Sequence, residues 1–150
     1  MKDEEARKVF MQFLKKRHCA ENLKFWVAVE RYSKLVTDEA RLTKAKEIFE
    51  KYLGESQCIQ LQSFNYSFNK IDEGAPLEIN VPYAVRSEVR TKMDDPQPDT
   101  FLSAQKSIFL LMVEGAFEYF ITSERYKAFQ RTSPPGTAYR LSFPTISLLC

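Results

Sequence analysis

The side chains that could perform chemistry gather near the N-terminus, at His18 and Cys19. A thiol next to an imidazole could supply a nucleophile and its base. Adjacent residues at a turn between helices rarely point at each other, however, and the chain has a single histidine with no evident third group to orient it. One histidine and three scattered cysteines, Cys19, Cys58 and Cys150, also make a poor metal-ligand set, and no Gly-rich phosphate loop is present. The residues therefore favour a binding protein over an enzyme, and no cofactor is predicted.

The most informative segment follows directly. An acid and an amide, Glu21 and Asn22, precede a block of large apolar residues, Leu23-Lys24-Phe25-Trp26. The apolar block needs a core, whereas the two polar residues lie at the start of a helix and can face a partner. A segment with both properties indicates a helical binding module rather than an enzyme built around a pocket.

Composition narrows the class of protein. Apolar residues make up 44% of the 150 residues and charged residues 28%, which is typical of one soluble globular domain. A net charge of +2 without a long basic run does not favour nucleic acid. An odd number of cysteines without a C-x-x-C pair fits a reducing compartment. The charged N-terminus suggests no signal peptide, and no window approaches the roughly 20 apolar residues that span a bilayer. We therefore expect a cytoplasmic protein.

One local cluster, Lys15-Lys16-Arg17, is basic. We interpret it as the solvated end of a helix, because cations suit helix C-termini. A distant alternative is electrostatic association of the first helix with a membrane surface.

Helical periodicity accounts for the first third of the chain. Helices are predicted over residues 3–17, 21–36 and 38–53, and Gly54 should end the third. In the second helix the inner stripe would consist of Phe25, Val29, Tyr32 and Val36. Residues 55–76 alternate polar and aromatic side chains without a second strand to pair with, which favours a long loop.

Helices resume after this loop. Asn80 is a good N-cap for the next helix, with Pro82 in its first turn. A further helix is expected near 99–113. Gly115 should interrupt the helical pattern, which resumes over residues 116–129; these two helices could be separate or continuous with a kink. The prediction is an all-α antiparallel bundle of about six to eight helices over residues 1–131, followed by an irregular tail over 132–150.

Ordered motifs along the chain resemble the RGS domain (regulator of G-protein signalling). These motifs extend over most of the helical region, in the order found in that family: Phe10-x-x-Phe13-Leu14, Glu21-Asn22-Leu23-x-Phe25-Trp26, Ala45-Lys-x-Ile48-x-x-x-Tyr52, Leu77-x-Ile79-Asn80-Val81, Ala104-Gln105-x-x-Ile108-Phe109-x-Leu111-Met112 and Phe120-x-x-Ser123-x-x-Tyr126. A single motif would be weak, but the ordered set is specific.

The resemblance implies a function. RGS domains bind the GTP-state α subunit (Gα) of heterotrimeric G proteins and speed its GTP hydrolysis by holding its switch segments, without contributing an acid, a base or a nucleophile. Asn80 matches the asparagine that supports the catalytic glutamine of Gα. The other contact positions that the resemblance implies are Glu21, Asn22, Tyr83 and Leu111. Asn80, Glu21 and Asn22 also have an ordinary role at helix starts, and Leu111 an ordinary role in the core.

The chain also departs from the family. Gly115 stands where activating members typically have Asp, and Tyr119 stands where they have the Arg that holds it. An RGS-like scaffold that binds Gα or another signalling protein without activating GTP hydrolysis is therefore the alternative. The first one or two helices of the family have no counterpart before Phe10, and the 55–76 loop is longer than usual.

Overall fold

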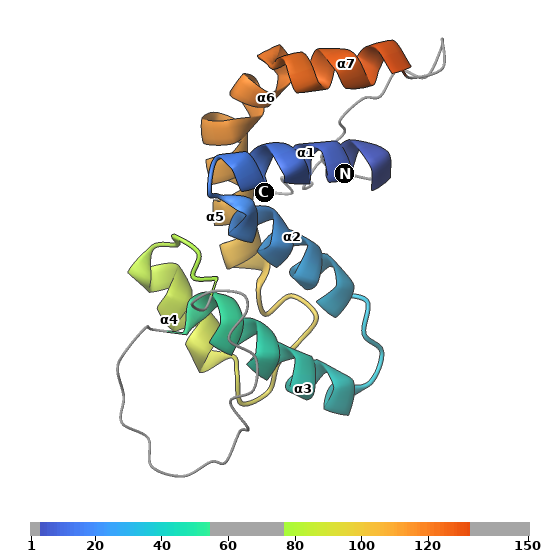
Figure 1. Cartoon of the computed structure of the whole chain (residues 1–150). Coiled ribbons are helices and arrows are strands. Elements are labelled where there is room, and N and C mark those ends of the chain that lie inside the picture. The colour runs from blue at the N-terminus through green and yellow to red at the C-terminus, as the bar shows by residue number, and fades with distance from the viewer. Residues whose placement is uncertain (1–3, 55–76, 133–150) are drawn as a thin grey trace, which may run out of the picture.

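The computed structural model describes residues 4–54 and 77–132, which contain helices and no strand. This confirms the predicted all-α class. The elements are α1 (Glu4–Lys16), α2 (Ala20–Tyr32), α3 (Asp38–Ile48), the π-helical η1 (Phe49–Leu53), α4 (Tyr83–Thr91), α5 (Leu102–Leu111), the π-helical η2 (Met112–Phe117), α6 (Glu118–Thr122) and α7 (Glu124–Thr132). Figure 1 shows α2 and α3 as antiparallel neighbours, with α1, α6 and α7 at the opposite end of the molecule from α3 and α4.

The longest rod combines three elements. Leu111, Met112, Phe117 and Glu118 all have right-handed helical backbone angles, so α5, η2 and α6 form one continuous helix from Leu102 to Thr122. Of the two alternatives that the sequence leaves open at Gly115, separate helices or one continuous helix, the structure has the continuous one, with Gly115 inside its π-helical stretch. A glycine costs a helix only about 1 kcal/mol relative to alanine, and burial of the apolar side chains around it outweighs that cost. The break comes instead at Ser123, whose backbone is extended and whose hydroxyl accepts a hydrogen bond from the Tyr126 amide at 3.3 Å.

Gly54 ends the third helical rod, as predicted. Its backbone is extended rather than left-handed, and its amide donates to the Phe49 carbonyl at 2.7 Å. A Cβ at this position would lie 2.9 Å from the Glu50 carbonyl oxygen. Close approach to the preceding turn, rather than a positive φ, is therefore the reason for glycine here.

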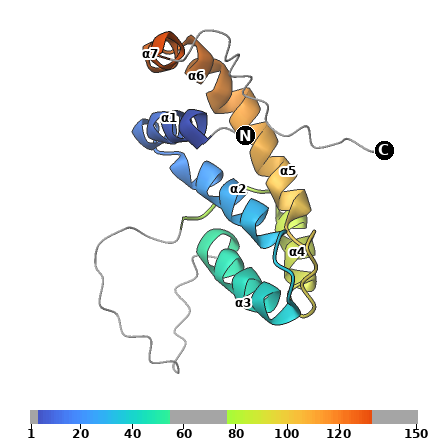
Figure 2. The same ribbon diagram turned by 90° about the vertical axis from the view of Figure 1, so that its right-hand side faces the viewer.

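Aromatic rings join the first helix to the last ones. The ring of Phe120 lies 4.9 Å from Phe10, 5.3 Å from Phe13 and 5.1 Å from Tyr126, measured between centroids. Such tilted ring pairs add about 0.5–1.5 kcal/mol each to the burial of their surface. The cluster joins α1 to α6 and α7, and Figure 2 shows these three helices at the same end of the molecule.

The central helix α2 packs against α5. Gln105 on α5 is buried and donates its side-chain amide to the Glu30 carboxylate at 2.8 Å and to the Trp26 carbonyl at 3.4 Å. The rings of Tyr32 and Phe101 meet edge to face at 5.1 Å near the other end of α2. Val36 does not extend this inner stripe as predicted, because α2 ends at Tyr32 and leaves Val36 with 89% of its surface exposed.

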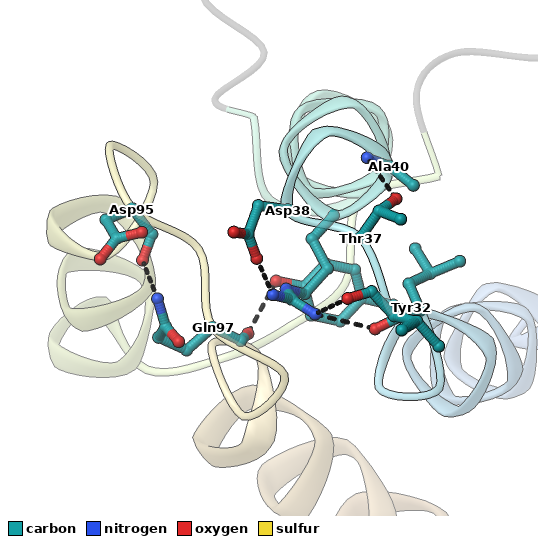
Figure 3. Close-up of polar contacts among 9 residues, drawn as sticks. Tyr32, Thr37, Asp38, Ala40, Asp95 and Gln97 are labelled. Carbon is teal, nitrogen blue, oxygen red and sulfur yellow. Dashed lines mark hydrogen bonds and ion pairs between the residues drawn. The ribbon is translucent and has the colours of Figure 1, made fainter.

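Polar contacts fix the turn between α2 and α3, as Figure 3 shows. The Tyr32 hydroxyl donates to the Gln97 carbonyl at 2.7 Å, and burial raises the pKa of this hydroxyl. Thr37 caps α3 by accepting from the Ala40 amide at 3.4 Å. Arg41 donates to the Leu35 and Val36 carbonyls, at 2.9 and 3.2 Å, and pairs with the Asp38 carboxylate.

The approach to α4 differs from the prediction. Asn80 is not the N-cap, because α4 begins at Tyr83 and Pro82 occupies the cap position. The backbone before it follows the core instead: Ile79 and Val81 are buried, and the Ile79 amide donates to the Tyr52 carbonyl at 3.0 Å. Arg86 on α4 links this segment to the end of η1, because its guanidinium donates to the Glu78 carboxylate at 2.9 Å and to the Leu53 carbonyl at 3.0 Å.

The predicted 55–76 loop and nearly all of the 132–150 tail lie outside the described residues; Thr132 still belongs to α7. Within the described residues no helix is both long and apolar enough to cross a membrane.

Replacing Tyr32 by phenylalanine should lower the free energy of unfolding by about 1 kcal/mol, because the ring packing remains and the hydrogen bond from the hydroxyl to Gln97 is lost. Urea titration followed by circular dichroism measures this change. The control is Tyr83→Phe, since Tyr83 is 79% exposed and should tolerate loss of its hydroxyl. Equal stability of both variants would show that the bond does not hold the turn.

Candidate functional site

The turn between α1 and α2 carries the first group of candidate residues. The Cys19 amide donates to the Leu14 carbonyl at 3.1 Å, and His18 adopts a left-handed φ of 54°, the usual conformation just after a helix. This tight turn starts α2 next to α1 and places Glu21 and Asn22 in its first turn. Glu21 is half-buried, and Asn22 exposes 9% of its surface, so any partner reaches only the edge of this amide.

The rod from α5 to α6 carries a second group. Leu111 is 41% exposed and therefore lies on the surface rather than on the predicted inner stripe. Gly115 is exposed in η2, and a Cβ built on it would have no neighbour within 4 Å. Tyr119 follows on α6 with 58% of its surface exposed. Since the three positions are spaced by four residues along one rod, they follow one another on successive turns.

Arg17 connects these two groups. Its guanidinium lies 4.7 Å from the centroid of the Tyr119 ring and 5.6 Å from that of Phe13. A cation over an aromatic face at such distances contributes about 0.5–1 kcal/mol at an exposed site. The α1–α2 turn is thus joined to α6 at Tyr119.

A third group precedes α4. Asn80 is exposed between the buried residues Ile79 and Val81, and Tyr83 is 79% exposed at the first position of α4. Figure 1 shows the start of α2, the segment before α4 and the η2 stretch along its left-hand side.

The thiol next to His18 does not have the environment of a nucleophile. Burial raises the pKa of Cys19, which reduces its thiolate fraction at neutral pH. The thiol faces the Leu14 carbonyl at 3.8 Å, and His18 is exposed. Among the described residues no group of three His, Cys, Asp or Glu side chains could hold a metal ion.

Geometry therefore defines a class of protein: a helical module whose candidate residues, an amide, an acid and several exposed apolar side chains, suit protein recognition. Comparison with known proteins identifies the family. The family model described as "Regulator of G protein signaling domain" matches residues 1–73 and 67–129. The chain belongs to this RGS family, and regulation of G-protein signalling is the function that goes with it.

Individual relatives agree with this assignment. The chain is 36% identical over 128 residues to "Regulator of G-protein signaling loco" of Drosophila melanogaster, covering 85% of this chain and 7% of that protein. It is 32% identical over 118 residues to "Regulator of G-protein signaling 5" of Rattus norvegicus, covering 79% of this chain and 55% of that protein. It is 28% identical over 131 residues to "Regulator of G-protein signaling 13" of Homo sapiens, covering 87% and 71%. The chain thus spans little of the fly protein and about half of the rat one.

The sequence does not predict the roles of two residues that support the site. Arg17 belongs to a cluster predicted as a solvated helix end, yet it lies over two rings. Gln105 belongs to a family motif, and its burial between α2 and α5 gives the motif a physical reason. A polar residue within an apolar helical stripe was the available signal for Gln105. No local signal distinguished Arg17 from its neighbours.

A double-mutant cycle tests the contact between Arg17 and Tyr119. Single substitutions Arg17→Gln and Tyr119→Leu and the double variant should show a coupling of about 0.5–1 kcal/mol in the free energy of unfolding. Tyr119→Phe should retain the coupling because it keeps the ring. Strictly additive effects would show that the contact contributes nothing to the fold.

Proposed function

We propose that this domain binds the activated Gα subunit and accelerates its GTP hydrolysis by stabilising the switch segments. The residues that we assign to the contact are Glu21, Asn22, Asn80, Tyr83, Leu111, Gly115 and Tyr119. The domain needs no cofactor for this, since the reacting groups belong to Gα. The partner is a protein in its GTP or transition-state form, and membrane proximity comes through that partner.

One observation carries the proposal: the way in which Asn80 is held. Its side chain is exposed, while Ile79 and Val81 on either side expose 1% and 7% of their surface. The backbone is tied to the core by the Ile79 amide, which donates to the Tyr52 carbonyl. A polar group fixed in this way makes its contact with little loss of conformational entropy on binding. An amide presented on a rigid segment is what support of a partner's catalytic glutamine requires.

Replacement of Asn80 by alanine tests the proposal. The variant should fold normally, since Asn80 caps no helix, and it should reduce the acceleration of single-turnover GTP hydrolysis by at least about tenfold, because a preorganised polar contact is lost. The matched control is Gln130→Ala, which removes an exposed amide from α7. An Asn80→Ala domain as active as the control would remove Asn80 from the site. No acceleration by the parent domain of any Gα in a panel would rule out activation itself.

A second function, binding without activation, is favoured by Gly115 and Tyr119. The acid and the arginine of activating relatives are both absent, so no unpaired charge is left, and tyrosine is itself a common residue in interfaces. Such a scaffold would bind the GTP-analogue form of Gα as tightly as the transition-state mimic. An activating domain would prefer the mimic.

Restoring the family's pair should increase activation. The double substitution Gly115→Asp with Tyr119→Arg should raise the rate of GTP hydrolysis on a responsive Gα by about tenfold or more, since the carboxylate regains a partner contact together with the cation that holds it. Open space around Gly115 accommodates the new side chain.

Gly115→Ala is the control, because it adds helix propensity without a charge. Rates are compared at a temperature where all variants are folded, since Tyr119→Arg removes the ring beneath Arg17. An unchanged rate would show that the missing pair is not what limits activation.

A further inference from the structure

A groove of about 710 Å³ runs between α1, α2 and the rod formed by α3 and η1. Figure 2 shows these three helices one above the other. None of the residues assigned to the Gα contact lines the groove. The α2 residues that line the groove are Lys24, Val27, Ala28 and Arg31. They lie on the side of α2 turned away from Trp26 and Glu30, which contact α5.

The floor of the groove is apolar. Ile48 and Tyr52 are buried at its base, and Met11, Val27 and Ala28 are half-buried beside them. An occupant therefore needs an apolar face to cover these side chains.

The rim is cationic. Six basic residues and two acidic ones line the groove, which is an excess of four positive charges (6 − 2). Lys8 pairs with Glu4 and Glu5, and Lys44 pairs with Glu47. In the part of the chain that the structure describes, no acidic side chain forms an ion pair with Arg7, Lys24, Arg31 or Lys51. These four cations can therefore pair with an acidic ligand, and the Lys51 ammonium lies 5.8 Å from the centroid of the Tyr52 ring.

The cations have a regular spacing. Lys24 and Arg31 are seven residues apart on α2, and Lys44 and Lys51 are seven apart on the α3–η1 rod. Seven residues correspond to two helical turns, about 10 Å. At that separation α2 presents two cations without an ion-pair partner, and the antiparallel α3–η1 rod presents Lys51 together with Lys44, which pairs with Glu47. A partner helix with acids two turns apart on each side of an apolar stripe would match both rows.

We propose that this groove binds an acidic amphipathic helix of a partner protein, at a surface separate from that for Gα. The apolar stripe of the helix would cover Met11, Val27 and Ile48, and its acids would pair with the cations on the rim. A flat membrane surface matches a concave groove with a recessed apolar floor less well, and nucleic acid offers no apolar face. The combination of recessed floor and double cation row selects the protein helix.

A designed peptide tests this inference. The probe is a helical peptide with a leucine stripe at heptad spacing, flanked on both sides by glutamates seven positions apart, with a fluorophore for anisotropy. The parent domain should bind it, and added salt should weaken binding because the rim charges are exposed. A peptide with the same composition in scrambled order should not bind.

Charge reversal locates the binding. Lys24→Glu with Arg31→Glu should raise the dissociation constant at least about tenfold, through lost attraction and new repulsion. The matched control is Lys46→Glu with Lys106→Glu, which makes the same charge change at exposed residues that do not line the groove. Met11→Gln should also weaken binding at unchanged net charge, since it places an amide on the apolar floor.

Several results would overturn the proposal. One is failure of the parent domain to bind the designed peptide, and another is equal loss of affinity in the groove and control variants. Binding of phosphatidylserine vesicles through Lys24 and Arg31, without peptide binding, would assign the groove to a lipid surface. Self-association that those reversals abolish, seen by analytical ultracentrifugation, would assign it to a second copy of the chain. None of these assays contains Gα, so their outcome is independent of the proposed activation.

Discussion

The packing of α2 against α5 sets the position of both candidate surfaces of this domain. Gln105 is buried at this contact and has its acceptors on α2, the Glu30 carboxylate and the Trp26 carbonyl. A buried amide deprived of such partners costs about 1–3 kcal/mol, so these bonds favour one register of the two helices over its neighbours. The Tyr32 ring against Phe101 fixes the same register near the end of α2. Because α2 is held in this way, its first turn forms part of the candidate Gα contact, and its side turned away from α5 lines the groove.

The candidate Gα surface is assembled from helix ends and a continuous rod rather than from a pocket. Asn80 precedes α4, Glu21 begins α2, and Leu111 and Tyr119 lie along the rod from α5 to α6. Each is backed by core residues, as Ile79 and Val81 show on either side of Asn80. Such a surface acts by its shape and preorganised contacts, in agreement with the proposed activation of a partner's own active site. On the same rod, the ring of Tyr119 lies beneath an arginine from the α1–α2 turn, which joins that turn to α6.

The two sides of α2 differ in chemistry. The start of α2, which belongs to the candidate Gα contact, presents an acid and an amide, Glu21 and Asn22. The groove instead combines a recessed apolar floor with rows of cations. A domain with separate surfaces of this kind can bring a second protein close to a G protein without competition for the same residues. The net charge of +2 hides this asymmetry, because the residues outside the groove carry a net charge of −2 (+2 − 4) that offsets the excess of cations within it.

Local sequence pattern determined the helical class, the first three helices and the stop at Gly54, because amphipathic periodicity and turn chemistry act between residues that are close in the chain. Ordered motifs determined the family and thereby the candidate residues. Tertiary structure alone decided the features that depend on distant residues. Helix α4 starts at Tyr83 because Ile79 and Val81 are buried in the core. Gly115 is helical because the rod is packed on both sides of it. Arg17 lies over the ring of Tyr119, which belongs to a helix near the other end of the chain. A short-range pattern contains no information about such contacts, since they arise only when the bundle closes.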